Sequence, residues 1–77
     1  MMNESARQLL ETHLEMARTT ENDTVAEVQL NIAAGMLAYA STNGDLAPRE
    51  FFAESQTLKL IREQRRLASI AKGGAHA

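Results

Sequence analysis

The sequence predicts an all-α fold, a small three-helix bundle in which a helical hairpin is followed by a longer, basic third helix. Apolar residues recur at spacings of three and four along most of the chain, which is the period of an amphipathic helix. No segment shows the strict alternation of apolar and polar residues that indicates a strand. Gly44 and Pro48 bracket one loop, so helix-breaking residues divide the chain between helical segments.

The first helix is expected over about residues 4–18. Asn3 or Ser5 can cap its first turn, and Glu4 lies where the helix dipole favours a negative charge. A polar segment that begins at Thr19 ends the periodic pattern. Six residues at helical spacing are expected to form the apolar stripe of this helix: Ala6, Leu9, Leu10, His13, Met16 and Ala17.

The second helix is expected to begin at a capping box, in which the Thr24 hydroxyl accepts a backbone hydrogen bond and Glu27 reaches back to the cap. It is expected to end at Asn43 and Gly44, because glycine readily takes the left-handed conformation that closes a helix. A helix that is apolar over more than half of its circumference lies between other helices, so we expect this one to be central. Its two apolar stripes are Val25, Val28, Ile32, Met36 and Tyr39, and beside them Leu30, Ala33 and Leu37.

The third helix is expected to begin at Pro48, which suits the first helical turn. Residues 1–72 are predicted to form a single helical domain that ends with this helix, and residues 73–77 a flexible tail. Phe51 and Leu58 fall outside the main apolar stripe, so the start of the helix is either enclosed or exposed for a partner. The main stripe consists of Ala53, Leu60, Ile61, Gln64, Leu67, Ala68 and Ala71.

The chain has 77 residues and no cysteine, which limits how it is stabilised and what it binds. A single core of this size supplies only about 3–5 kcal/mol, and small proteins supplement it with disulfides, metals or association. Disulfides are excluded, and His13 and His76 are too far apart in sequence to indicate a histidine metal site. We therefore expect no metal and no cofactor, and we expect a homodimer or a complex with another protein.

The sequence contains no motif for catalysis, and we expect the protein not to be an enzyme. It has no Gly-x-Ser-x-Gly turn, no glycine-rich phosphate loop and no His-Glu-x-x-His pair. It also has no apolar run of the roughly 20 residues that span a membrane, and its N-terminus lacks the features of a secretory signal. The expected location is cytoplasmic. Small cysteine-free helical proteins of this sort are common among accessory genes of bacteria and phages, where some act as inhibitors.

Charge is segregated along the chain. Residues 1–50 carry eight acidic and three basic side chains, a net charge of −5, whereas residues 51–77 carry five basic and two acidic ones, a net charge of +3. At about 100° per residue, the cations of the third helix gather on one side of it. Such asymmetry indicates a surface that meets a partner. These cations are Lys59, Arg62, Arg65 and Arg66.

Four interpretations of this basic group remain open. It contacts nucleic-acid phosphates, an acidic surface of a protein or anionic lipid, or it forms a solvated face whose charge is offset by carboxylates of the same fold. A sequence pI near 5.6 and two acidic helices count against nucleic acid. Lipid binding favours bulky apolar residues opposite the basic side, where this helix has mostly Ala, Leu and Ile.

The sequence therefore favours a non-enzymatic protein-interaction module, a regulator or inhibitor that binds an acidic surface of a larger protein or pairs with itself. The alternatives are a nucleic-acid-binding regulator that uses the basic helix, and a structural subunit of an assembly. No membrane partner is expected. Of the two neighbouring phenylalanines, we expect one to be buried and the other at least partly exposed. The expected partner-binding residues are Phe51, Phe52, Leu58, Lys59, Arg62, Arg65 and Arg66.

Overall fold

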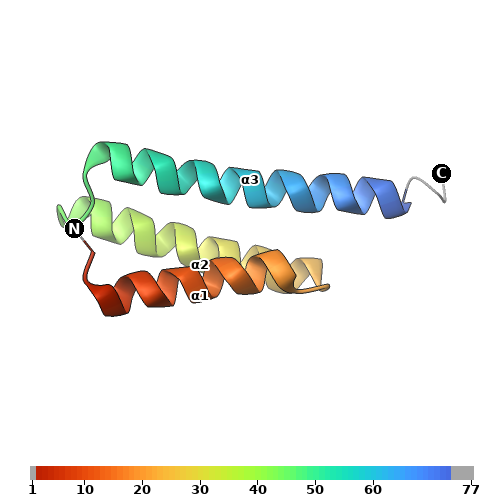
Figure 1. Cartoon of the computed structure of the whole chain (residues 1–77), viewed down its shortest axis with the longest axis horizontal. Coiled ribbons are helices and arrows are strands. Elements are labelled where there is room, and N and C mark those ends of the chain that lie inside the picture. Colours follow the sequence, from red (N-terminus) through yellow and green to blue (C-terminus); the bar gives the residue numbers. More distant parts are fainter. Residues whose placement is uncertain (1, 74–77) are drawn as a thin grey trace.

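A computed structural model describes residues 2–73, which form three helices and no strand (Figure 1). The helices are α1 (Glu4–Thr19), α2 (Asp23–Thr42) and α3 (Pro48–Gly73). The prediction of an all-α chain with three helices is therefore confirmed. Of the predicted tail, Gly73 is the last residue of α3, and residues 74–77 lie outside the described residues.

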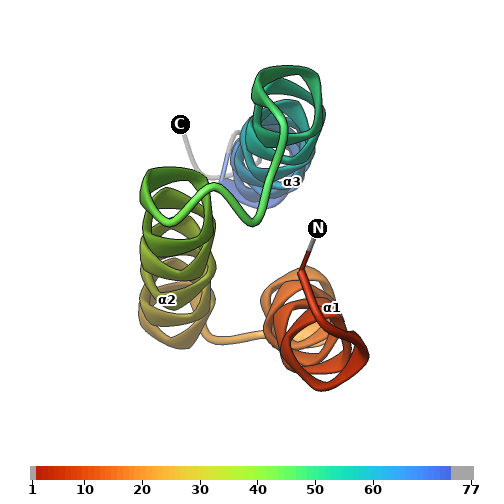
Figure 2. The same ribbon diagram turned by 90° about the vertical axis from the view of Figure 1, so that its left-hand side faces the viewer.

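The three helices lie side by side in a bundle of 47 × 20 × 14 Å. In Figure 1, α1 and α2 form an antiparallel hairpin, and α3 returns along it and continues past the turn between them. Figure 2 looks along the bundle and shows the helices at the corners of a triangle. α2 packs against both other helices, which contact each other less, so α2 is the central element of the packing.

One face of each helix forms the hydrophobic core. Met2, which precedes α1, and the loop residue Leu46 close the end of the bundle where the chain begins. No buried polar side-chain atom among the described residues lacks a hydrogen-bond partner. The buried residues of the core are Met2, Leu10, Leu14, Ala17, Leu30, Ala33, Leu37, Ala40, Leu46, Leu58 and Ile61.

The face that α3 turns to the core differs from the predicted one. Leu60 and Leu67, which the sequence placed in the main stripe, are exposed, and of that stripe only Ile61 is buried. The physical reason is that α3 carries two apolar stripes, and polar contacts with the hairpin fix which one turns inward. The face turned inward has a spacing of three and four residues and consists of Phe51, Glu54, Leu58, Ile61 and Arg65.

Of the two predicted apolar stripes of α2, one is buried and the other is largely exposed. The stripe of Leu30, Ala33 and Leu37 is buried as predicted. The wider stripe beside it is not enclosed, because α1 and α3 both pack against the same side of α2. Four of its residues are exposed: Val25, Val28, Ile32 and Tyr39.

The apolar stripe of α1 also needs correction. Leu10 and Ala17 are buried as predicted, and Leu14, which was not included in the stripe, is buried with them. Leu9 and Met16 are exposed on the side of α1 that continues the exposed stripe of α2. The buried face of α1 is therefore centred nearer to Leu14 than the sequence predicted. The predicted stripe included Leu9 and Met16, which lie beyond the edge of the buried face.

Side-chain caps fix where the first two helices begin. Of the two predicted caps, Asn3 rather than Ser5 caps α1, by accepting a hydrogen bond from the backbone N–H of Ala6 at 2.8 Å. The predicted capping box of α2 is wrong, because Asn22 rather than Thr24 is the cap and accepts from the N–H of Val25 at 3.0 Å. The helix therefore begins at Asp23, two residues earlier than a Thr24 cap allows.

The loop between α2 and α3 uses the expected glycine and proline. Gly44 has a φ of 77°, the left-handed conformation predicted for it. Pro48 occupies the first position of α3. Before it, the N–H of Ala47 donates to the carboxylate of Glu50 at 3.0 Å, and buried Leu46 anchors the loop in the core.

Candidate protein-binding surface

The apolar members of the predicted partner-binding set lie on opposite sides of α3. Leu58 is only 5% exposed and belongs to the core, so the prediction that it contacts a partner is corrected. Phe51 is half-buried against the core, whereas Phe52 is 64% exposed. The two phenylalanines thus divide between the inward and the outward face of the helix, because neighbouring residues are about 100° apart.

Arg65 is a structural clamp. Its side chain is 18% exposed, and its Nη1 donates to the backbone carbonyls of Ala17 at 3.1 Å and Thr20 at 2.6 Å. Its Nη2 donates to the carboxylate of Asp23 at 2.6 Å. The guanidinium therefore satisfies carbonyls at the C-terminal end of α1 and joins the α1–α2 turn to α3. These contacts occupy the side chain within the chain's own fold.

Arg62 also pairs with the hairpin, although at an exposed position. Its Nε and Nη2 donate to one carboxylate oxygen of Glu27 at 3.1 and 2.9 Å, and Nη2 also reaches Asn31 at 3.3 Å. Glu27, which the sequence assigned to a cap, thus holds α3 against α2. Exposed pairs of this kind contribute little to stability, about 0–1 kcal/mol.

The remaining two cations lie on the outward side of α3. Arg66 donates two hydrogen bonds to Glu63 on the same helix. These bonds lower the pKa of the Glu63 carboxyl below its usual range and raise the pKa of Arg66. Lys59 makes no ion pair among the described residues and is exposed.

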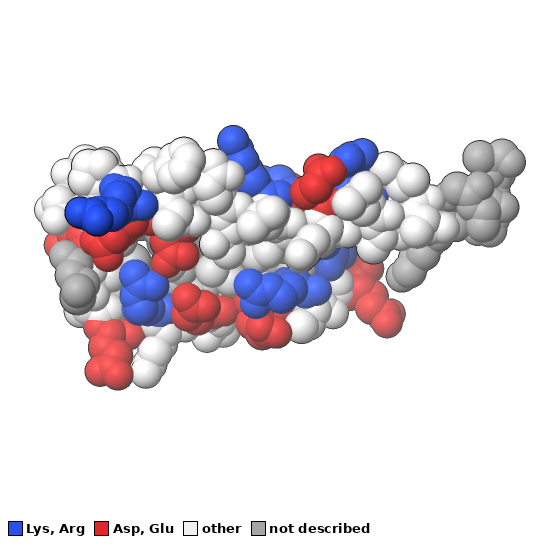
Figure 3. Space-filling view, turned by 45° about the horizontal axis from the view of Figure 1, so that its top comes forward, with Lys and Arg blue, Asp and Glu red and all other residues white. Residues whose placement is uncertain are grey.

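The charge that is segregated along the sequence is largely balanced in space. Three of the four cations of the basic group face a carboxylate, two of them from α2. Figure 3 shows acidic and basic side chains interspersed over the face it presents, rather than a continuous basic field. The fold thus supports the interpretation that carboxylates of the same chain offset the basic group.

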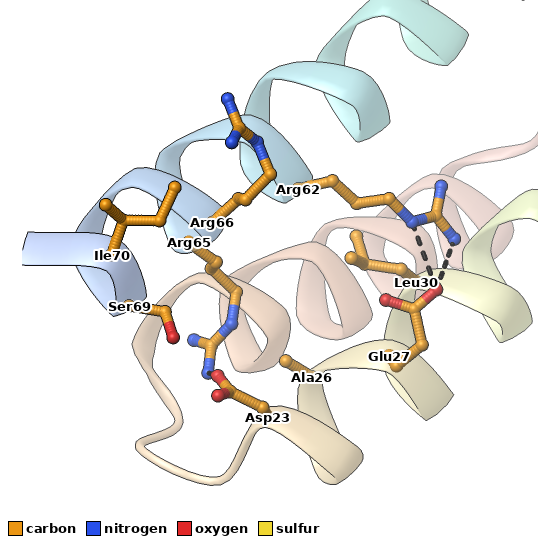
Figure 4. Close-up of a pocket in the computed structure, with 9 residues that line it drawn as sticks. All are labelled: Asp23, Ala26, Glu27, Leu30, Arg62, Arg65, Arg66, Ser69 and Ile70. Carbon is orange, nitrogen blue, oxygen red and sulfur yellow. Dashed lines mark hydrogen bonds and ion pairs between the residues drawn. The ribbon is translucent and has the colours of Figure 1, made fainter. Parts of the chain in front are cut away.

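A shallow groove separates the start of α2 from the last turns of α3 (Figure 4). Its volume is about 380 Å³. Ala26 and Leu30 form its apolar floor, and the Arg62–Glu27 and Arg65–Asp23 pairs cross it. The groove is lined by Asp23, Ala26, Glu27, Leu30, Arg62, Arg65, Arg66, Ser69 and Ile70.

The outward face of α3 carries a set of apolar side chains that the sequence did not group as one surface: it named Phe52 as a partner contact, placed Leu60 and Leu67 in the core-facing stripe and left Ile70 out. They are between 53% and 64% exposed and lie opposite the face turned to the core. Lys59 and Arg66 lie at their edge. The signal that identifies them is a second helical spacing, of eight, seven and three residues, which is offset from the inward stripe by about half a turn. This outward face consists of Phe52, Leu60, Leu67 and Ile70.

Neither a metal-binding cluster nor a membrane-spanning segment is found in the part of the chain that the structure describes. No three His, Asp or Glu side chains among residues 2–73 are grouped so that they would hold a metal ion. The half-buried His13 pairs through Nδ1 with the side chain of Gln29 on α2. None of the described helices has a segment long and apolar enough to cross a membrane.

Comparison with models of protein families, with curated proteins and with solved structures gave no match. Function must therefore be inferred from the surfaces of the molecule.

Proposed function

We propose that this chain is a non-enzymatic protein-interaction module, a regulator or inhibitor that covers part of the surface of a larger protein. The contact is the outward face of α3, and the observation that carries the proposal is the exposure of its four large apolar side chains. Isolated exposed apolar residues are ordinary, but a row of them along one helix marks an interaction site.

The shape of α3 supports this proposal. Arg65 meets the turn between α1 and α2, and residues 66–73 continue for about 12 Å past that point. Leu67 and Ile70 lie on this projecting part. A helix that extends beyond its own bundle can enter a groove of a partner and bury apolar side chains at spacings of three, four and seven residues.

The chemistry of the face indicates the partner. Leu60, Leu67 and Ile70 require an apolar groove, and aromatic Phe52 is suited to a pocket at one end of it. Lys59, which forms no ion pair among the described residues, favours an acidic rim on the partner. The expected partner is therefore a protein with an apolar groove edged by Asp or Glu.

Nucleic acid is supported less well as the partner. Phosphate binding needs arginines whose charge is available, and here Arg62, Arg65 and Arg66 each face a carboxylate. Binding phosphate would require breaking these pairs, and breaking the Arg65 contacts would also release the end of α1. Lys59 alone is too small an electrostatic surface for a dedicated binder.

The test is affinity capture of the partner from lysate of the source cells, with and without nuclease, followed by titration of the purified partner. Leu67→Glu places a charge in the centre of the proposed contact, and we expect it to weaken binding about tenfold or more. Ile32→Glu makes a similar change at an exposed apolar site on α2 and is the matched control.

A protein recovered in both nuclease arms, lost by Leu67→Glu and kept by Ile32→Glu, supports the proposal. Recovery that disappears with nuclease would indicate the nucleic-acid alternative. Equal binding by wild type and Leu67→Glu would show that α3 is not the contact.

A further inference from the structure

A second exposed apolar surface lies on the hairpin, on the side turned away from α3. We call it the hairpin face. Its side chains are between 38% and 71% exposed, and Tyr39 is the most exposed of them. The proposed contact on α3 uses none of its residues. The hairpin face consists of Leu9 and Met16 of α1 with Val25, Val28, Ile32 and Tyr39 of α2.

Contacts between the helices establish that these residues share one side. Arg7 of α1 bonds Glu54 of α3 at 2.9 Å, which marks the side of α1 that faces α3. The pair of His13 and Gln29 joins α1 to α2 on the opposite side. At about 100° per residue, Leu9 and Met16 both lie about 40–60° beyond His13, on the side away from the core. Val25 and Ile32 lie in the same way beyond Gln29. The two exposed rows therefore adjoin.

The hairpin face carries no charged side chain. α2 has none after Glu27, so residues 28–42 are entirely uncharged. On α1, the charged residues fall within about 80° of the helix circumference, on the side away from Leu9 and Met16. That charged group consists of Glu4, Arg7, Glu11, Glu15 and Arg18. An uncharged face matches a second uncharged face without leaving any charge unpaired.

The spacing of residues on α2 is symmetric. Val28, Ile32, Gly35 and Tyr39 follow one another at intervals of four, three and four residues. When two such helices lie antiparallel about a two-fold axis between Ala33 and Ala34, Val28 meets Tyr39 of the second copy. Ile32 then meets Gly35 of the second copy, and both contacts occur twice, as a two-fold interface requires.

Gly35 fits this arrangement and has no role in the single chain. A Cβ added to it would meet nothing within 4 Å. Glycine within a helix is unfavourable relative to alanine, so its presence needs a reason. In the antiparallel pair, the missing side chain leaves a recess for Ile32 of the second copy. The two helices would thus approach most closely at the centre of the interface. There Ile32 of each copy lies opposite Gly35 of the other.

We propose that the hairpin face is the surface through which two copies of this chain pair, with α2 antiparallel to α2 of the second copy. The two helices offer a footprint of about 500 Å² per copy, from their lengths and spacing. The pair would bury about 1000 Å², which meets the lower limit for a specific interface, so we expect a weak dimer.

The first test is sedimentation or light scattering of the full chain over a concentration series. We expect dimers at about 100 μM. Ile32→Glu should leave only monomers, because it buries a charge without a partner, and Gly35→Leu should weaken pairing about tenfold by filling the recess. Leu67→Glu on α3 is the matched control and should dimerise like wild type. Wild type that stays monomeric at that concentration overturns the proposal.

The second test determines whether the two α2 helices pair in the antiparallel orientation. Because the chain has no cysteine of its own, only the introduced cysteines can form disulfides. A chain with both Val28→Cys and Tyr39→Cys should form a disulfide-linked dimer on mild oxidation. Val28→Cys alone should not, since in the antiparallel pair the two copies of this residue lie about 16 Å apart, beyond disulfide range. Efficient cross-linking by Val28→Cys alone would contradict the antiparallel arrangement.

These results are independent of the function proposed for α3. Loss of partner binding in Leu67→Glu with dimers intact would separate the two surfaces. Failure to dimerise would leave the α3 proposal standing.

Discussion

Arg65 joins three segments of the chain through one guanidinium. It is less exposed than any other cation that forms an ion pair in the described residues, and it bonds two carbonyls at the end of α1 and the carboxylate of Asp23. Its neighbour Arg62 makes an exposed pair that water can replace. Two arginines three residues apart, which look equivalent in the sequence, thus have different roles.

The difference predicts different costs of removal. Arg65→Ala should lower the free energy of unfolding by about 2 kcal/mol, because buried carbonyls and the turn lose their donor. Arg62→Ala should lower it by less than about 1 kcal/mol. Chemical denaturation followed by circular dichroism measures both. Equal losses from the two changes would show that Arg65 is not a clamp.

At the scale of the element, α3 has an apolar stripe on each of two opposite sides. The inward stripe holds Leu58 and Ile61, and the outward stripe holds Phe52, Leu60 and Leu67. The two are similar in hydrophobicity, so composition and periodicity do not distinguish them. Glu54 and Arg65 determine which stripe faces the core. Both lie on the inward side, where Glu54 bonds Arg7 of α1 and Arg65 bonds the turn that follows α1.

The orientation of α3 is tested by one substitution on each stripe. Leu58→Ala should cost about 2–5 kcal/mol of stability because it leaves a cavity in the core. Phe52→Ala removes more atoms but should cost less than about 0.5 kcal/mol, since the ring lies in solvent. Urea denaturation of both variants is the measurement. A larger loss from Phe52→Ala would mean that the outward face is covered.

The start of α2 offers a second test at this scale. Asn22→Ala should destabilise the protein by about 1 kcal/mol, because the N–H of Val25 loses its acceptor. Thr24→Ala should change stability by only a few tenths of a kcal/mol, since Thr24 is already inside the helix. Thermal unfolding monitored by circular dichroism compares them. The reverse order would restore the capping box expected from the sequence.

Across the whole molecule, helix ends that depend on a single residue and its near neighbours could be predicted from the sequence. Gly44, Pro48 and Asn3 fix helix ends through their own backbone preferences or side-chain bonds, and the structure has them in the predicted roles. The burial of Leu58 and the exposure of Leu60 were not predictable. They depend on contacts between segments more than 40 residues apart, such as that of Arg7 with Glu54.

The candidate surface on α3 was likewise predictable only in part. The sequence located it on the third helix and named Phe52 and Lys59, which are exposed. It attributed the surface mainly to charge, whereas in the folded chain the arginines face Glu27, Asp23 and Glu63. Net charge along a sequence does not reveal which carboxylates the fold brings beside which cations.

If the outward face of α3 binds protein through apolar contacts, binding should depend only weakly on salt. The measurement is a titration of the purified partner against the chain between about 50 and 500 mM salt. We predict that the dissociation constant rises by less than about fivefold, because Leu67 and its apolar neighbours provide the affinity. A log-linear loss of about a hundredfold or more would show that the basic group binds phosphate or an acidic surface through charge, and would contradict binding through the apolar side chains of α3.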